Sequence, residues 1–341
     1  MPGGDALQGP PSPPCDRQTW NIEIIHFLLD YGIDINARDR FRQTALHVAT
    51  NEDTVDLLVR HGANIEAKDL RSVTAVHRAA ESGSAPPLEC LLSRGAKANP
   101  SSMIDNTKGL QPPLTLAVAS GSVDAVLMLL QFGAVINTMD VGWSALHEAV
   151  SHGHIEVARV LLSRGAKSIT TVQGESPLHI AVRLADYQMA ELLLNYGASV
   201  QALNGDGWGA IHIVSNAKPV DTKVADTCRF INKLVLSGVN LHLTDKKRRT
   251  PLHLAVSNLA DDLIISTLIQ NGCDIKATTH KDETILDILM AQIPYWRAQY
   301  HEEYMYVDHL MYTLVTAVLD LSCRNQQSST ILMRAVELRA A

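Results

Sequence analysis

The sequence predicts an all-α solenoid, because two short features alternate along most of its 341 residues. One is a six-residue phrase that starts with Thr or Ser and has His at its fourth position. The other is an apolar stretch that ends in glycine. Together they predict roughly nine units of two antiparallel helices joined by hairpin loops. One such pair cannot bury its own apolar faces, so each unit must stack on its neighbours.

The phrase predicts where the first helix of each unit begins. A Ser or Thr hydroxyl caps a helix N-terminus, and proline fits the first helical position, where no N–H donor is needed. The clear copies are T-A-L-H-V-A from Thr44, T-A-V-H-R-A from Thr74, S-A-L-H-E-A from Ser144, S-P-L-H-I-A from Ser176 and T-P-L-H-L-A from Thr250, and weaker copies start at Pro112, Gly209, Thr284 and Thr330.

The glycines predict where the second helix ends. Val157, Ala158, Leu161 and Leu162 form the apolar stripe of an amphipathic helix, and Gly165 follows it. Glycine ends a helix readily because it adopts the left-handed conformation without a Cβ clash. The equivalent glycines are Gly32, Gly62, Gly95, Gly133, Gly197, Gly238 and Gly272.

The phrase and its spacing of about 33 residues resemble the ankyrin repeat. The resemblance implies that the loops between units project as fingers beside a concave face, where partner proteins bind. It also implies that Asn36, in the stretch L-L-D-Y-G-I-D-I-N, lies in the family's context for asparagine hydroxylation.

The histidines of the phrase are predicted to be structural. Stacked units would place them on a ladder with rungs roughly 10 Å apart, too far for a shared metal or catalytic site. We therefore expect each to form hydrogen bonds near its helix start. They are His47, His77, His147, His179, His212 and His253.

Composition narrows the class of function. Apolar residues make up 46% of the chain, which is enough to bury a long continuous core. The net charge is 29 − 36 = −7 and there is no long basic run, which argues against nucleic acid as a partner. The sequence has no apolar run of membrane-spanning length, and its five cysteines are scattered, as suits a reducing compartment. We expect a soluble intracellular monomer in the cytoplasm, the nucleus or both. It would bind neither membrane nor cofactor.

The spacing breaks at three places. His147 precedes Gly165 by 18 residues, but His47 precedes Gly62 by only 15, which predicts a clipped turn between the two helices. Residues 216–226 carry an insertion that predicts a surface loop. Residues 99–109 lengthen the loop between two units. The insertion at 216–226 is either a contact loop or an idle one, because added loop length costs little.

The predicted fingertips carry the candidate partner-binding residues. Exposed aromatic and arginine side chains are enriched among binding hot spots. Alternatively, each tryptophan folds over its own finger and the basic run is a solvated turn. The candidates are Arg40, Phe41, Arg42, Trp143, Trp208, Lys246, Lys247, Arg248 and Arg249.

The two ends depart from the repeat. Residues 1–18 are rich in Pro and Gly and predict a disordered leader. The array, residues 19–289, starts with a second helix at residues 21–31 and lacks the first, which indicates a splice form, a fragment, a gene-model artefact or a site completed by a partner helix. Residues 290–341 predict an aromatic-rich helical cap, with a long helix near 294–321 and a last partial repeat from Thr330.

These observations predict a non-catalytic scaffold or adaptor that binds proteins through its concave surface and loop tips. One alternative is a substrate-recognition adaptor of a cullin-type ubiquitin ligase, although residues 320–341 lack the expected leucine, cysteine and Leu-Pro pattern. An enzyme is the most distant alternative, because no nucleophile–base pair, phosphate loop or metal-ligand cluster is present. The near match to a zinc-protease motif at His301 fails, since Met305 replaces the second histidine.

Overall fold

The computed structural model describes residues 17–100, 111–139, 142–216 and 224–291. These residues form fifteen α-helices and a further helical stretch at 285–291, and their one isolated β-bridge joins Thr278 and Thr284. The prediction of an all-α repeat solenoid is therefore confirmed. The chain divides into two compact units, residues 1–165 and 166–341, which are described separately.

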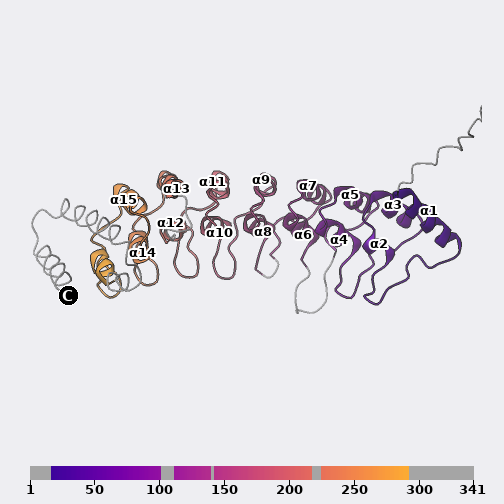
Figure 1. Ribbon diagram of the computed structural model, residues 1–341, viewed down its shortest axis with the longest axis horizontal. Coiled ribbons are helices and arrows are strands. Elements are labelled where there is room, and N and C mark those ends of the chain that lie inside the picture. The colour runs from indigo at the N-terminus through magenta and orange to yellow at the C-terminus, as the bar shows by residue number, and fades with distance from the viewer. Residues whose placement is uncertain (1–16, 101–110, 140–141, 217–223, 292–341) are drawn as a thin grey trace, which may run out of the picture. The chain divides into compact units, whose positions relative to one another are not determined.

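The first unit stacks its helices in two rows (Figure 1). The first helices of successive repeats pack on one another, as α4 does on α2 and α6, and the second helices do the same, as α5 does on α3 and α7. The loops between repeats project from the row of first helices. The helices are α1 (Arg17–Asp30), α2 (Ala45–Val48), α3 (Glu52–Arg60), α4 (Ala75–Glu81), α5 (Ala85–Ser93), α6 (Pro113–Ala119), α7 (Val123–Gln131), α8 (Ala145–Ser151) and α9 (Ile155–Ser163).

The second unit repeats this arrangement. The first helices α10, α12 and α14 form one row, and α11, α13 and α15 form the other. Their bounds are α10 (Pro177–Arg183), α11 (Tyr187–Asn195), α12 (Ala210–Ser215), α13 (Val224–Leu236), α14 (Pro251–Ser257) and α15 (Asp262–Gln270). No helix of the described residues is both long and apolar enough to cross a membrane.

Each phrase histidine caps its own helix, and three of them, His47, His179 and His212, also hold the next finger. The backbone N–H of Ser176 donates to Nδ1 of His179 at 3.0 Å, and the Ser176 hydroxyl accepts from the His179 N–H. Since Nδ1 accepts, Nε2 carries the proton and donates to the Ala202 carbonyl at 3.0 Å. The same bond to the next finger joins His47 to Val73 and His212 to Leu243. The predicted structural role of these histidines is confirmed.

A second ladder of side-chain amides joins successive repeats. Asn99, four residues after the helix-ending Gly95, donates from Nδ2 to the Gly133 carbonyl at 2.8 Å and accepts from the Val135 N–H at 3.0 Å. Both ends of the amide are thereby satisfied by the next helix terminus. Equivalent pairs of bonds join Asn36 to Gly62 and Asn64, and Gln201 to Gly238 and Asn240.

The short spacing before Gly62 removes a helical turn. Helix α2 has four residues and α8 has seven, whereas three residues connect each of them to the following helix. The prediction of a clipped inter-helix turn is therefore wrong. The connection keeps its length because Asn51 still caps α3, accepting from the Thr54 N–H at 2.8 Å.

The insertion in the second unit is partly helical. Helix α13 begins at Val224 and has 13 residues, whereas α11, the equivalent helix of the preceding repeat, has nine. Residues 224–226 were predicted to lie in a surface loop and instead form the first turn of this helix. Residues 217–223 lie outside the described part of the chain, as do 101–110 of the longer loop, 1–16 of the leader and 292–341 of the cap and last partial repeat. Helix α1 begins four residues before the predicted start at Asn21.

We expect the fold to lose stability as the pH falls from 6.5 towards 4. Burial lowers the pKa of His77 from 6.5 to about 4, and the opposing charge of Asp69 offsets this only in part. Above pH 6.5 the imidazole is neutral in both states. Below it, the unfolded chain binds a proton that the folded chain excludes, which costs about 3 kcal/mol by pH 4. Burial also lowers the pKa of His179 and His212.

Urea-unfolding midpoints measured across this pH range check the prediction. The His77→Gln variant should be less stable at neutral pH, because the cap is lost, and its midpoint should depend less steeply on pH. An unchanged pH dependence in this variant would contradict the assignment to His77.

Candidate partner-binding surface

Four of the described fingers are held in shape by a side chain at their base, that of Asp39, Asp69, Asn204 or Asp245. Asp39 Oδ1 accepts the N–H groups of Phe41 and Gln43, both at 2.8 Å. Asp245 does the same for Lys247 and Arg249, again at 2.8 Å. The carboxylate replaces the backbone partners that the tight turn cannot supply. The tip conformation is therefore fixed within the chain itself.

Two of the tips carry arginine in the left-handed backbone region. Arg42 has φ 61° and Arg248 has φ 57°, at the position where the fingers before Ser144, Ser176 and Gly209 have glycine. A residue with a Cβ costs roughly 1 kcal/mol more than glycine in this conformation. Both side chains are exposed, so these fingers present a cation at a conformational cost.

Neighbouring tips are joined by backbone hydrogen bonds within each unit. The Leu70 N–H donates to the Phe41 carbonyl at 3.0 Å. In the second unit, the Lys246 N–H donates to Asp206 at 3.3 Å and the His280 N–H donates to Lys247 at 3.1 Å. Side chains from successive fingers therefore lie side by side along one edge.

Trp208 packs against the next finger. Its Nε1 donates to Asp245 Oδ2 at 3.3 Å, and the guanidinium of Arg249 lies 5.9 Å from the centroid of its ring. The indole is half-buried by these contacts. Trp208 thus links two fingers and leaves limited surface for a partner.

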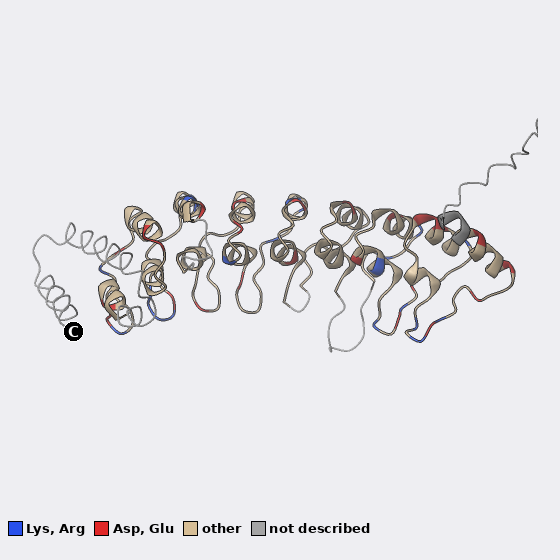
Figure 2. Ribbon diagram, in the orientation of Figure 1, with Lys and Arg blue, Asp and Glu red and all other residues tan. Residues whose placement is uncertain are grey.

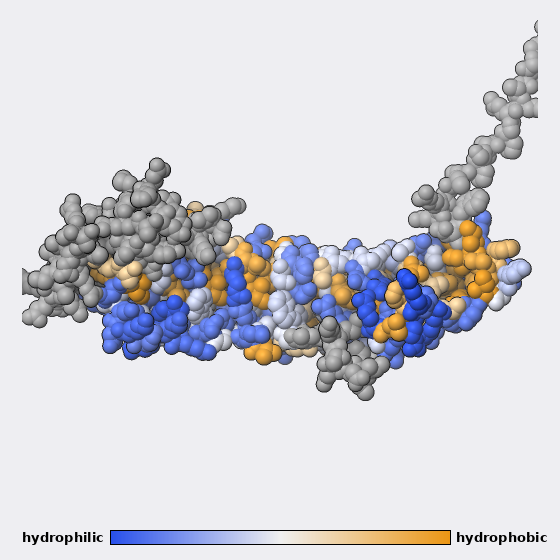
Figure 3. Space-filling model, turned by 60° about the horizontal axis from the view of Figure 1, so that its bottom comes forward, coloured by the Kyte–Doolittle hydropathy of each residue, from blue (hydrophilic) through white to orange (hydrophobic). Residues whose placement is uncertain are grey.

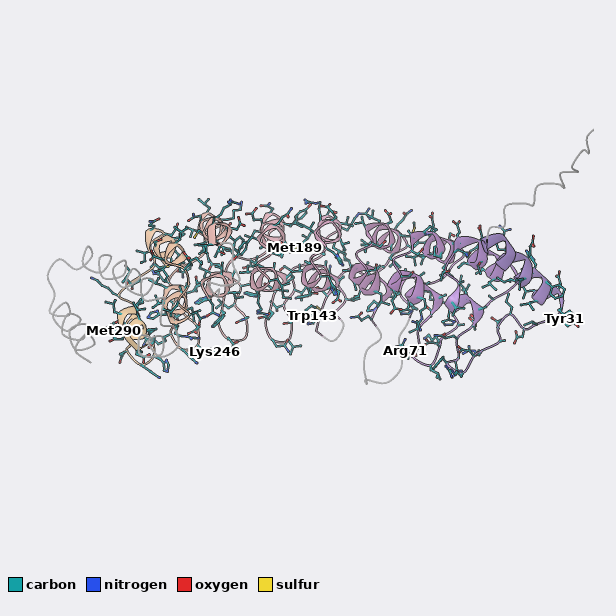
Figure 4. The ribbon with its side chains drawn as sticks, in the orientation of Figure 1. Tyr31, Arg71, Trp143, Met189, Lys246 and Met290 are labelled. Atoms are coloured by element: carbon teal, nitrogen blue, oxygen red, sulfur yellow. The ribbon has the colours of Figure 1, made fainter. Side chains whose placement is uncertain are left out.

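Trp143 is more available. It is 38% exposed, and its ring lies 5.7 Å from the ring of His147 on the helix that follows (Figure 4). Val135 and Met139 of the same finger are also exposed. This finger therefore presents apolar side chains to solvent, an arrangement typical of contact surfaces.

The basic run divides into a free part and a paired part. Lys246, Lys247 and Arg248 are exposed at the tip, and Figure 2 shows their finger as a cationic segment. Arg249 instead forms an ion pair with Asp245 at 2.8 Å. Burial raises the pKa of Asp245, but the N–H groups and charge of Arg249 outweigh it and the pKa is lowered. Asp245 is therefore a buried anion that ties Arg249 to the fold.

Phe41 is 49% exposed, and the Arg40 guanidinium lies 4.7 Å from its ring centroid. The structure adds one apolar neighbour that sequence reasoning missed, namely Leu70, which is 61% exposed and whose N–H donates to the Phe41 carbonyl at 3.0 Å. The sequence does contain a signal for Leu70 as a fingertip residue. It follows Asp69 directly, just as Arg40 follows Asp39.

Asn36 is engaged at both ends of its amide. Its Oδ1 accepts from the Asn64 N–H at 2.7 Å, and its Nδ2 donates to Gly62 at 3.4 Å. Hydroxylation of Asn36 stays a prediction. An enzyme that modifies this residue has to open these bonds first.

The side chains of the described residues are better suited to contact with a partner than to nucleophilic or metal chemistry. Burial raises the pKa of the Cys90 and Cys228 thiols and raises that of Cys273 to about 12, so these thiols are protonated and weak nucleophiles. Across the described ranges, no group of three or more His, Cys, Asp or Glu side chains is placed to hold a metal ion. The exposed fingertip groups offer apolar contact and positive charge.

Comparisons with known proteins agree with this architecture. A family model for ankyrin repeats in three copies matches residues 17–102, 76–172 and 114–204, and a single-repeat model matches 247–280. No match was found among curated proteins. The crystal structure of the human ASB11 ankyrin repeat domain is similar, with a TM-score of 0.54 and 24% sequence identity over 65% of this chain and 95% of that chain. At this identity the likeness shows the fold alone.

We expect Asp245→Ala to lower the free energy of unfolding by about 3 kcal/mol, because it leaves Arg249 and the Trp208 indole without their buried acceptor. Chemical denaturation followed by tryptophan fluorescence measures this loss. Lys246→Ala, one residue further along and exposed, is the matched control and should change stability by less than about 0.5 kcal/mol. Equal effects of the two substitutions would show that Asp245 does not clamp the finger.

Proposed function

The chain belongs to the ankyrin repeat family, and we propose that it is a non-catalytic protein-binding module serving as a scaffold or adaptor. The observation that carries this proposal is the exposure of large apolar side chains on the fingers. Trp143, Phe41 and Leu70 are each more than a third exposed, although burying them in a core would stabilise the fold.

The rigidity of their two fingers makes Phe41 and Leu70 effective anchors. Association costs free energy when flexible loops and side chains become ordered. Here the clamp of Asp39 and the bond from Leu70 to Phe41 fix the tips before a partner arrives. A partner would then gain apolar contact with little ordering cost, which supports recognition through the fingers.

Trp143 is the sharpest test of this proposal. We expect Trp143→Ala to reduce recovery of specific partners by about tenfold, because tryptophan anchors contribute 2 kcal/mol or more at many interfaces. Affinity purification of the tagged full chain with quantitative mass spectrometry measures the recovery. Thermal unfolding of the same variant shows whether the fold is retained.

Phe132→Ala is the matched control. Phe132 is an aromatic residue of similar exposure, 40%, at the end of α7 in the same unit. Its substitution should leave recovery within about twofold, since a residue outside the contact surface changes binding by only a few tenths of a kcal/mol. Full partner recovery by Trp143→Ala, with its fold intact, would count against contact through this finger.

A further inference from the structure

The first two fingers of the first unit form a mixed cationic and apolar surface, here named the arginine–phenylalanine tip. It combines four exposed arginines with two exposed apolar side chains from two fingers. Figure 3 shows hydrophobic surface beside strongly hydrophilic surface over the fingers of this unit. The residues are Arg38, Arg40, Phe41, Arg42, Leu70 and Arg71.

Printed contacts hold the two fingers together at this point. The Leu70 N–H donates to the Phe41 carbonyl at 3.0 Å, and Arg38 Nη1 donates to the Lys68 carbonyl at 3.0 Å. One bond lies at the tips and the other lies nearer the base. Phe41 and Leu70 therefore lie on adjoining loops, and their apolar side chains can contact one ligand together.

The nearest carboxylates are already occupied. Asp39 Oδ1 accepts two backbone N–H groups of its own finger. Asp69 is buried, accepts the N–H groups of Arg71 and Val73, and pairs with Arg78 at 3.5 Å. The described residues place no acidic side chain in an ion pair with Arg38, Arg40, Arg42 or Arg71. Counted with Asp39 and Asp69, the four arginines still leave this tip with a net positive charge.

The negative charge of the rest of the chain directs acidic ligands to this tip. The whole sequence carries a net charge of −7, so an acidic ligand is repelled by most of the protein and attracted to the few cationic tips. Arginine binds carboxylates through two parallel N–H donors, which adds orientation to attraction. The exposed Phe41 and Leu70 add an apolar surface that a purely ionic ligand would leave in contact with water.

We propose that the arginine–phenylalanine tip binds an extended acidic segment of a partner protein, one rich in Asp and Glu with a bulky apolar residue among them. The carboxylates pair with the arginines, and the apolar residue packs between Phe41 and Leu70. This inference rests on the proposed protein-binding function and names the class of partner. A single-stranded nucleic acid would also satisfy the charges and stack a base on Phe41, but the aliphatic Leu70 beside it suits an apolar side chain better, and RNA is therefore an outcome of the test.

Fluorescence anisotropy with the full chain tests the proposal. The probe is a fluorescein-labelled twelve-residue peptide of alternating Asp and Glu with one central Trp. Matched probes replace Trp with Ala, replace the acids with Asn and Gln, or consist of a twelve-nucleotide single-stranded RNA. We expect saturable binding of the first probe, weaker binding at higher salt, and a loss of about tenfold in affinity for the Asn/Gln probe.

Two variants locate the site. Arg40→Glu/Arg71→Glu should weaken binding by about tenfold, because two attractive charges become repulsive. Phe41→Ala should weaken the Trp probe by about fivefold and the Ala probe by less than twofold, because only the former has an apolar anchor. All three positions are exposed, so the fold should be retained. Lys246→Glu/Lys247→Glu makes the same charge change in the second unit and should alter affinity by less than twofold.

The proposal is overturned by absent or non-saturable binding of the first probe, by equal losses in the two charge-reversed variants, or by tighter binding of the RNA. The partner purification described above separates the two claims. If Arg40→Glu/Arg71→Glu leaves every specific partner in place, the tip is wrong and the protein-binding function stands. If the wild-type chain recovers no specific partner and does not bind the probe, both claims fail.

Discussion

The histidine of the repeated phrase carries the most constrained interaction in the fold. In His47, His179 and His212, one ring nitrogen accepts from the cap residue of its own helix and the other donates to a carbonyl of the next finger, as His179 does between Ser176 and Ala202. The imidazole has to be neutral and in a single tautomer for both bonds to form. Helix start, finger position and stacking of repeats therefore depend on the same buried ring, and the low pKa of His77 follows from that burial.

Much of the fold could be predicted because its signals are local. The cap residue, the histidine three positions later and the helix-ending glycine lie within one repeat, so the helices and the role of the histidines follow from short-range rules. The four-residue α2 could not be predicted in the same way. A deletion of three residues shortens either a turn or a helix. In the structure Asn51 caps α3 after a connection of normal length, but an asparagine at this place in the sequence would fit a shortened turn as well.

The candidate surface was less predictable, because exposure depends on residues far away in the sequence. Trp143 and Trp208 occupy the same position before the phrase, yet Asp245, 37 positions later, holds Trp208. Arg249 is removed from the basic run by the same carboxylate. Leu70 gained significance only when its backbone bond placed it beside Phe41. Side-chain identity suggested the fingers, and tertiary contacts decided which of their groups are free.

The finger clamp separates the shape of the tips from their chemistry. An Asp or Asn at the base binds the backbone N–H groups two and four positions later, as Asp39, Asp69, Asn204 and Asp245 all do. Since every residue except proline offers that N–H, the clamp does not depend on the side chains that the turn displays, apart from the left-handed position that Arg42 and Arg248 occupy. Mutation can therefore exchange arginine, leucine, lysine or tryptophan at a tip without rebuilding the loop. A lineage of such chains can change partners one finger at a time while the scaffold beneath stays the same.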